Sequence, residues 1–415
     1  MAIDVAGLIR SFNAGRDPER LQLKYEAMRA SPFTFLRGTC HLFYARMARG
    51  GVHKAAPSVW ACGDLHLENF GSYKGDNRLA YFDINDFDES ALAPATWDLV
   101  RFLASVQVGA ATLQVGEAKA KRLCETFVEA YADALALGKA YWIERDTATG
   151  LVHELLDDLG GRERAAFIAK RTQLNGKKHR LNITNGKALR ANAGQHKRVV
   201  AFMREFAKTQ ANPSFYEVLD VARRVAGTGS LGVERYVILV RGKGSPDGNY
   251  LLDLKASLAS ALVPRLKVTQ PRFASNAARI TAVQRRLQAV PMDFLHAVRF
   301  ENEAGDRDAP AVLRGLQPSE DRVELGRAGG EMKALGPLLA TMGQVVAWAQ
   351  LRSAGQGGSA IVDALIAFGG RKKWRVPLLA ASRECAAQVF ADAKTYNAAF
   401  DAGFFFPGKP GKPGK

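Results

Sequence analysis

The chain has 415 residues, of which 47% are hydrophobic and 24% charged, so it is long enough for two or three folded globular domains. Its four cysteines are widely spread and form neither a C-x-x-C pair nor a zinc-ligand spacing, which excludes a disulfide framework and leads us to expect reduced thiols and a cytoplasmic location. The N-terminus lacks the order of a signal peptide, and we expect no membrane span because no apolar run approaches ~20 residues.

The formal net charge is +17, and part of this excess is local. Residues 161–210 contain thirteen Lys and Arg side chains against two glutamates, Glu163 and Glu205. Such a segment attracts polyanions such as nucleic acid, anionic lipid or phosphorylated ligands. This predicts a polyanion contact through 161–210, and the alternative is a solvated basic face.

The first half of the chain is predicted to begin and end with helices around a pair of short strands. The segment 21–30 has Leu21, Tyr25 and Met28 at helical spacing before Pro32 ends the pattern. Short strands are predicted within 58–64 and 79–86, with polar residues at their ends. Two helices follow directly, at 97–111 and 117–138.

The second half changes to β structure and then returns to helix. The basic segment 161–210 is predicted to be mixed, with helix in pieces. Strands at 235–240 and 249–255 are joined by a turn rich in Gly, Ser, Pro, Asp and Asn, as in a hairpin. A helix at 274–290, a strand at 311–316, a long helix at 337–354 and a last helix follow. We divide the chain into a catalytic-loop and helical lobe (1–215), a β lobe (216–320), a helical remainder of the large lobe (321–405) and a disordered tail (406–415).

The most informative feature is a concentration of acidic and amide side chains in a basic chain. CGDLHLENF at 62–70 is followed by FDINDFDE at 82–89. Phosphoryl transfer needs an Asp that orients the nucleophile, an Asn and an Asp that hold magnesium, a Lys that binds the phosphates and a glycine-rich lid. Asp64 and Asn69 stand five residues apart on one loop, where their oxygens could face one Mg²⁺ ion.

GDLHLEN resembles the catalytic loop of the aminoglycoside phosphotransferase and choline kinase branch of the protein-kinase-like fold. FDINDFDES followed by WDLVRF resembles the metal-binding Asp of that branch and its Asp-Leu helix. The longer run from FLRGT through CGDLHLENFG to WDLVRF is similar to the uncharacterised bacterial family numbered 2252 among domains of unknown function. The resemblance implies that Asp64 is the catalytic base and Asn69 a metal ligand, and that His66 hydrogen-bonds Asp64 or the backbone.

The resemblance implies a second metal ligand at Asp86 or Asp83. In related phosphotransferases this Asp precedes the Asp of the Asp-Leu helix by about twelve residues, and Asp86 is twelve residues before Asp98 whereas Asp83 is fifteen before it. We favour Asp86, and Asp83 or Asp88 could orient a second ion. Asp98 is expected to be structural, since a buried Asp at a helix start commonly accepts backbone N–H groups.

GTGSLG, with Gly227, Gly229 and Gly232, is a G-x-G-x-x-G that is weak evidence by itself. It is followed by a strand, as in a kinase glycine loop and not as in a dinucleotide-binding turn. Lys255 lies on the next strand and is assigned the phosphate-binding role, with a solvated strand lysine as the alternative. The order of these parts predicts a circularly permuted, two-lobe protein-kinase-like fold of α+β class, unless the glycine loop matches by chance.

One part of a kinase is missing. A kinase has a Glu on the helix after the lysine strand, but residues 256–291 contain no acidic residue. Either Asp253 or a carboxylate of the acidic cluster holds Lys255, or the protein is a pseudoenzyme. The leading hypothesis is an ATP- and magnesium-dependent phosphotransferase acting on a hydroxyl of an unknown small molecule. The alternatives are a catalytically impaired nucleotide-binding regulator and a basic nucleic-acid-binding protein.

Overall fold

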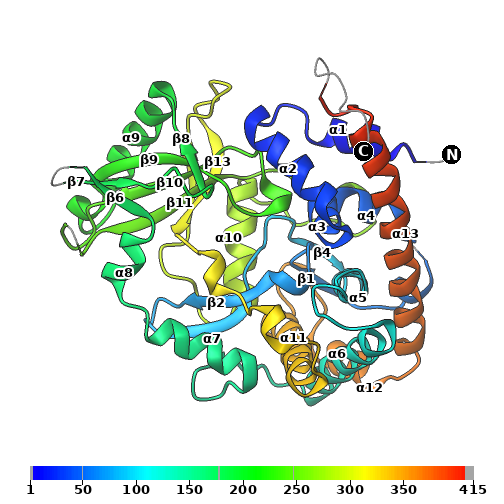
Figure 1. Cartoon of the computed structure of the whole chain (residues 1–415). Helices are drawn as coiled ribbons and strands as arrows, with labels where there is room; N and C mark the ends of the chain where they lie inside the picture. The colour runs from blue at the N-terminus through cyan, green and yellow to red at the C-terminus, as the bar shows by residue number, and fades with distance from the viewer. Residues whose placement is uncertain (1–2, 49, 176–177, 246, 407–415) are drawn as a thin grey trace.

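The computed structural model describes residues 3–48, 50–175, 178–245 and 247–406, and has a mixed α+β architecture (Figure 1). The expected tail falls almost wholly on residues 407–415, which lie outside the described residues. The helices, in chain order, are α1 (Val5–Phe12), α2 (Pro18–Ala30), α3 (Pro32–Gly38), α4 (Cys40–Arg46), α5 (Thr96–Val108), α6 (Glu117–Leu137), α7 (Gly150–Gly160), α8 (Arg164–Ala169), α9 (Ala193–Lys208), α10 (Asn276–Leu287), α11 (Met332–Arg352), α12 (Val362–Gly370) and α13 (Arg375–Asp401).

The strands are short and every pairing between them is antiparallel. They are β1 (Ser58–Ala61), β2 (Phe70–Lys74), β3 (Ala80–Ile84), β4 (Ala91–Pro94), β5 (Ile143–Glu144), β6 (Thr172–Asn175), β7 (Lys178–Leu181), β8 (Ala188–Arg190), β9 (Val218–Arg224), β10 (Arg235–Val240), β11 (Tyr250–Ala256), β12 (His296–Phe300) and β13 (Ala309–Gly315).

One six-stranded sheet dominates the second half, with strand order β12-β13-β11-β10-β9-β8. The hairpin expected from 235–240 and 249–255 is confirmed as β10 and β11, whose register pairs Arg235 with Lys255. Because side chains alternate along a strand, the sheet has two apolar faces. Val199 and Met203 of α9 pack on one face, and Ile168 of α8 packs on the other. Residues 188–208, which precede the expected boundary at 215, therefore contribute to the sheet layer.

The remaining helices form a body around the main core, with α6 packed along α11 and α5 along α13 (Figure 1). A Cβ on Gly343 would lie 2.5 Å from the carbonyl oxygen of Phe127, so α11 and α6 approach at backbone distance. By length and composition α11 is a candidate membrane span, but 67% of its most apolar window is buried, as in the core helix of a soluble protein. The first and last helices, α1 and α13, are also in contact, so the two ends of the folded chain meet.

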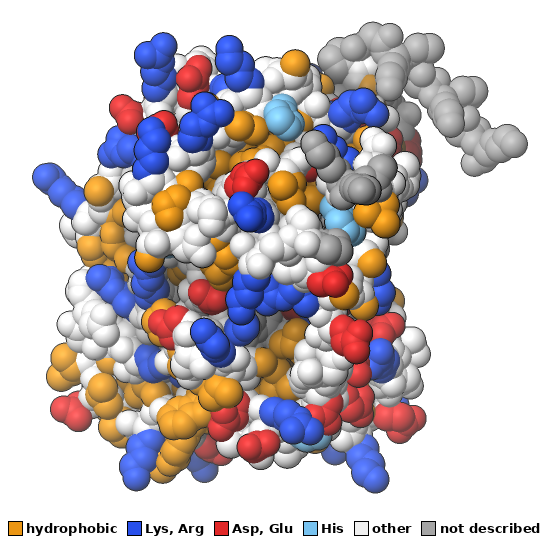
Figure 2. Space-filling view, turned by 90° about the vertical axis from the view of Figure 1, so that its left-hand side faces the viewer, with side chains coloured by type: hydrophobic (Ala, Val, Ile, Leu, Met, Phe, Trp, Pro, Cys, Tyr) orange, Lys and Arg blue, Asp and Glu red, His pale blue; other side chains and the backbone are white. Residues whose placement is uncertain are grey.

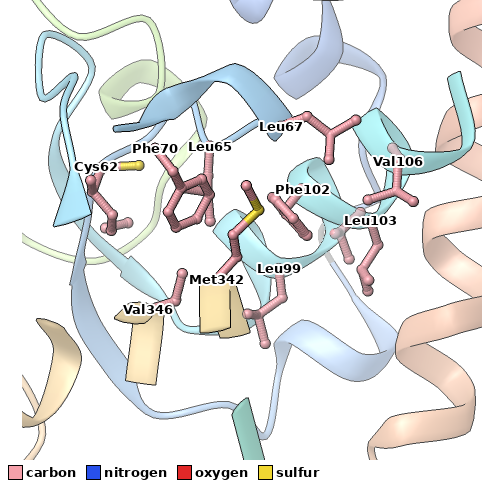
Figure 3. Packing of buried hydrophobic residues seen from close by; sticks show 14 of the residues in the cluster. Cys62, Leu65, Leu67, Phe70, Leu99, Phe102, Leu103, Val106, Met342 and Val346 are labelled. Carbon is pink, nitrogen blue, oxygen red and sulfur yellow. The ribbon is translucent and has the colours of Figure 1, made fainter. Parts of the chain in front are cut away.

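The 62–70 loop is fixed by its own apolar residues. Leu65, Leu67 and Phe70 are buried, and they alternate with the polar side chains of the loop. Figure 3 shows these residues packed against α5 and α11, which contribute Leu99, Phe102, Leu103, Val106, Met342 and Val346. A loop anchored in this way holds its polar groups in place with little conformational freedom.

Candidate functional site

A small pocket brings two distant parts of the chain together. It has a volume of about 70 Å³ and lies between the 62–70 loop, the acidic loop that we define as residues 85–90, and the glycine loop that we define as residues 227–232. We call it the central pocket. Seven of the nine site residues expected from the sequence line it: Asp64, His66, Asn69, Asp86, Gly227, Gly229 and Lys255.

The start of the 62–70 loop is held from below by α5. Asp98 is 3% exposed, and its carboxylate accepts the backbone N–H groups of Cys62 (2.8 Å) and Gly63 (3.0 Å). Burial raises the pKa of Asp98 to about 6, against the opposing effect of these two hydrogen bonds. The structural role expected for Asp98 is confirmed, although the donors belong to the loop and not to its own helix. Gly63 has φ +88°, and a Cβ there would meet the Glu89 carbonyl oxygen, so this turn requires glycine.

Asp64 projects from this loop and is oriented by a buried arginine. The Nε of Arg101 donates to Oδ1 of Asp64 at 2.7 Å, and the same guanidinium donates to the carbonyl oxygen of Leu36. Burial raises the pKa of Asp64 to about 6, an effect that Arg101 opposes. A Cβ on Gly229 would lie 3.9 Å from Oδ2 of Asp64, so the second carboxylate oxygen lies beside the glycine loop.

His66 and Asn69 shape the loop through backbone contacts. Nδ1 of His66 accepts the backbone N–H of Glu68 at 3.2 Å, and burial holds the pKa of His66 well below its usual value, so the ring is neutral. Of the two partners considered for His66, the backbone is the one observed. The Asn69 side-chain amide donates to the Asp64 carbonyl oxygen at 2.9 Å, and the Asn69 carbonyl accepts the N–H of Asn85 at 2.9 Å. The second contact places the acidic loop directly beside Asn69.

The two candidate metal carboxylates are in different surroundings. Asp86 lines the central pocket, and its Oδ1 accepts the backbone N–H of Asp88 at 3.2 Å. Asp83 is 3% exposed on β3, and its Oδ2 accepts from Arg352 (3.0 Å) and from the backbone N–H of Ala289 (3.1 Å). Asp83 therefore lies outside the pocket lining, in an ion pair with α11, whereas Asp86 faces the pocket.

Lys255 is held by the acidic loop and by the glycine loop. Its ammonium group contacts a carboxylate oxygen of Asp88 and lies 2.6 Å from Oγ of Ser230. Burial alone would raise the pKa of Asp88. Attraction to Lys255 is the largest opposing effect, and the pKa of Asp88 lies below its usual value. Of the substitutes considered for the missing helix glutamate, the acidic cluster supplies the carboxylate, because Asp253 is occupied by arginines. The helix α10 contributes a cation instead, since the Arg279 guanidinium donates to the carbonyl oxygen of Asp88 at 2.9 Å.

The glycine loop joins β9 to β10 and is bound to α2 and to the connection between α1 and α2. The carbonyl oxygen of Gly229 accepts from Nη1 of Arg16 (2.8 Å) and from Nζ of Lys24 (3.0 Å). Gly227 has φ +74° and Gly232 has φ +86°, which glycine adopts without strain. Gly232 lies outside the pocket lining, where a Cβ would lie 2.9 Å from Cβ of Arg16.

The donor chemistry of the pocket fits magnesium. Among the described residues, no group of three or more His, Cys, Asp and Glu side chains is arranged to hold a metal ion. The candidate set is smaller, with one carboxylate from Asp86, one amide from Asn69 and a second carboxylate nearby on Asp64. Magnesium binds oxygen ligands, keeps several waters and is commonly bound through one or two protein carboxylates plus phosphates. Asn69, Asp86 and Asp64 are therefore the residues that could hold a magnesium ion in this pocket.

Several site residues were not found by sequence reasoning. Arg16, Arg37 and Arg322 line the central pocket beside Glu89, and Arg101 binds Asp64 from outside the lining. Burial raises the pKa of Glu89 to about 7. Arg101 could have been found from the sequence, because a charged residue within the apolar run WDLVRFLASV is expected to be buried and paired with an opposite charge. The others come from helices or loops far away in sequence, and no local pattern marks them.

The fold and the site define a mixed α+β protein in which a polar pocket with charges of both signs lies between an antiparallel sheet and a helical body. The chain belongs to a family described as an uncharacterised protein conserved in bacteria, DUF2252, whose family model matches residues 16–399. The expected relation to family 2252 is thus confirmed. Comparison with curated proteins and with solved structures found no match.

Proposed function

We propose that this protein is an ATP- and magnesium-dependent phosphotransferase with a circularly permuted, kinase-like arrangement, acting on a hydroxyl group of a small molecule. The single observation that carries the proposal is the central pocket. Asp64, Asn69 and Asp86 come from the first quarter of the chain, and the glycine loop and Lys255 follow more than a hundred residues later, yet all of them line one cavity. A chance match of either motif would not require the two to meet.

The connectivity of the sheet supports the proposal further. The glycine loop joins β9 to β10, Lys255 lies on β11, and α10 separates β11 from the last hairpin. Five of the six strands of this sheet stand in the order β12-β13-β11-β10-β9, and β8 adds the sixth beside β9. A kinase-like small lobe has this arrangement, with the glycine loop between its first two strands, the lysine on the third and a helix before the last two. This is an analogy of fold, and the functional argument comes from the pocket.

Each polar residue of the pocket has a role in this proposal. Asp64, held by Arg101 and ionised above about pH 6, accepts the proton of the acceptor hydroxyl. Asn69 and Asp86 hold magnesium, which when bound neutralises charge on the phosphates. Lys255 binds the phosphate oxygens. Glycine-loop backbone N–H groups cover the phosphates, because residues without Cβ atoms allow close approach.

A second cavity, next to the central pocket, would hold the purine base of the nucleotide. It has a volume of about 200 Å³. Its apolar lining includes Val237 of β10 and Leu251 of β11, and its rim carries charged side chains that include Arg171, Lys187 and Glu320. Predominantly apolar walls with a few polar groups are typical of ligand-binding cavities. We call it the apolar cavity, and Gly227 and Arg322 line both it and the central pocket.

The absence of a helix glutamate does not by itself imply an inactive enzyme. Asp88 supplies a carboxylate to Lys255, and Arg279 of α10 supports the backbone that carries Asp88. The same contacts favour the second candidate, a nucleotide-binding regulator without turnover. The central pocket has a volume of about 70 Å³, and in both candidates Lys255 would exchange its contacts with Asp88 and Ser230 for contacts with phosphate oxygens.

Nucleic-acid binding has weaker support. Figure 2 views the left-hand side of Figure 1, where Lys and Arg side chains are interspersed with Asp and Glu side chains and do not form one continuous basic patch. Several cations of 161–210 are paired with carboxylates, including Arg162 with Asp321 and Arg171 with Glu320. The polyanion contact of this segment stays a prediction.

The test is ATP binding measured by thermal shift, with and without magnesium, on the wild type, Asp86→Ala and Lys255→Met. A ligand that binds only the folded protein raises the melting temperature. At a hundredfold excess over Kd it adds ~2.7 kcal/mol to the free energy of unfolding. We expect magnesium-dependent stabilisation of the wild type and its loss in both variants. Asp133→Ala, at an exposed position on α6, is the control. A wild type that ATP does not stabilise would contradict both nucleotide-based candidates. Binding without consumption of ATP across a panel of hydroxyl acceptors would favour the regulator.

A further inference from the structure

Three arginines converge on one carboxylate beside the central pocket. Asp253 of β11 is 0% exposed, and Arg235 of β10 donates to both of its oxygens, at 2.8 Å and 2.5 Å. Nη1 of Arg224, at the end of β9, lies 2.7 Å from Oδ2 of Asp253, and Nε of Arg314 on β13 lies 3.5 Å from the same oxygen. The cluster thus joins four neighbouring strands of the sheet.

The cluster contains more positive than negative charge. Three guanidinium groups face one carboxylate, and the arginines hold the pKa of Asp253 well below its usual value. Burial lowers the pKa of Arg224 to about 9, and Arg235 and Arg314 add to this lowering while Asp253 opposes it. Nη1 of Arg224 forms an ion pair with Asp253 at 2.7 Å, and its Nη2 donates to the carbonyl oxygen of Gln317. Because three guanidinium groups share a single carboxylate, the cluster carries a net positive charge that suits a further anion.

The position of the cluster indicates which anion it would bind. Side chains alternate along β11, so Leu251, Asp253 and Lys255 point to the same face of the sheet. Leu251 lines the apolar cavity and Lys255 lines the central pocket, and the cluster around Asp253 lies between them. Arg224 itself lines the apolar cavity, and Nη1 of Arg235 donates to the carbonyl oxygen before the glycine loop, at 3.3 Å.

We propose that Arg224, Arg235 and Arg314 form an anion subsite for the phosphate chain of the nucleotide, between its base in the apolar cavity and its transferred phosphate at Lys255. This inference rests on the proposed function and deepens it. Guanidinium groups suit the site because they bind phosphate oxygens through two parallel hydrogen bonds. The phosphate chain then shares the arginines with Asp253. If the cluster serves only to join the four strands, its loss lowers stability and leaves phosphate binding unchanged.

The experiment uses inorganic triphosphate as the probe, without magnesium, with binding measured by calorimetry on the full chain. Arg314→Met is the main variant, because the Arg314 contact to Asp253 is the longest of the three and its side chain is 14% exposed. Arg299→Met is the matched control on neighbouring β12, where Arg299 is 57% exposed and lies 3.9 Å from Asp308. We expect Arg314→Met to weaken triphosphate binding about tenfold or more and Arg299→Met to leave it unchanged.

Two further variants complete the test. Asp253→Asn is expected to bind triphosphate more tightly, because the competing charge is removed from the arginines. If Arg314→Met does not fold, Arg314→Lys keeps the charge and loses the forked geometry, so it is expected to bind more weakly than the wild type. A wild type that does not bind triphosphate overturns the inference, as does an Arg314 variant that melts earlier but binds equally well.

The outcomes also separate this inference from the proposed function. Triphosphate binding that depends on Arg314, without transfer from ATP to any acceptor, would leave the anion subsite standing and remove the phosphotransferase. ATP binding and transfer that persist unchanged in Arg314→Met would remove the anion subsite and leave the phosphotransferase standing.

Discussion

Replacing Asp88 by Asn isolates the ion pair between the acidic loop and Lys255. The Lys255 side chain is 7% exposed, and its ammonium group has two protein partners, Asp88 and Ser230. Removing one partner of a buried ion pair usually costs ~3–5 kcal/mol, because the other charge stays buried. The Asp88 side chain is 33% exposed, so screening by water reduces this value. We therefore expect Asp88→Asn to lower the free energy of unfolding by about 2 kcal/mol.

A double-mutant cycle tests this reasoning. In the Lys255→Met background no buried ammonium group is left unpaired, so Asp88→Asn should cost less than ~0.5 kcal/mol, which gives a coupling energy of about 1.5 kcal/mol or more. The assay is urea unfolding at neutral pH, with the dependence on urea compared among the four proteins. The control cycle is Arg145→Met with Asp157→Asn, an exposed pair with a 2.5 Å contact, where we expect a much smaller coupling energy because water screens both groups. Equal coupling in both cycles would refute the assignment of a special role to Asp88.

Three further results are expected. Asp98→Asn places an amide opposite two backbone N–H donors, so it should lower the free energy of unfolding in urea by about 2 kcal/mol. It should also reduce any ATP-dependent activity, because the 62–70 loop shifts. A loss of stability below ~0.5 kcal/mol would contradict the anchoring role of Asp98. The folded-state pKa of Asp64 lies above its ordinary value, so protonation favours the folded state. Its contribution to stability should fall as pH rises from 3.8 to about 6, whereas kcat/KM should fall as pH drops through about 6, and Asp64→Asn should remove both effects. Arg279→Met removes the donor to the carbonyl oxygens of Asp88, Ser90 and Leu258, so it should lower the free energy of unfolding by ~2–3 kcal/mol. It should also raise the Kd for ATP. An unchanged Kd would show that the acidic loop does not need α10.

Much of this arrangement is predictable from sequence because its parts are local. The strand before Asp64, the strand before Asp86 and the helix that carries Asp98 follow one another within fifty residues, and their hydrophobic periodicity is strong. The strand after the glycine loop and the position of Lys255 on the next strand were also recognisable, whereas β9 before the loop was not predicted. The twelve-residue spacing that favoured Asp86 over Asp83 agrees with their positions, since only Asp86 lines the central pocket.

The rest depends on contacts between residues far apart in sequence. Nothing near Lys255 indicates Asp88 as its partner, because the two are 167 residues apart. Arg16 reaches the glycine loop from the connection between α1 and α2, and Lys24 reaches it from α2; neither position carries a local pattern that would mark it. Residues 188–208 join the sheet through a three-residue strand, β8, which is too short to give a clear alternation.

The central claim is that Lys255 and the acidic loop form one nucleotide site, and labelling with an acyl phosphate of ATP tests it most directly. Such a probe transfers its acyl group to a lysine amine beside the bound phosphates, and mass spectrometry identifies the lysine. The account predicts acylation of Lys255 that requires magnesium, is blocked by excess ATP and is lost in Asp86→Ala. Lys121 of α6, whose side chain is 63% exposed, serves as the reference for non-specific reaction. A folded wild type whose Lys255 is acylated no faster than Lys121, with or without ATP, would contradict the account.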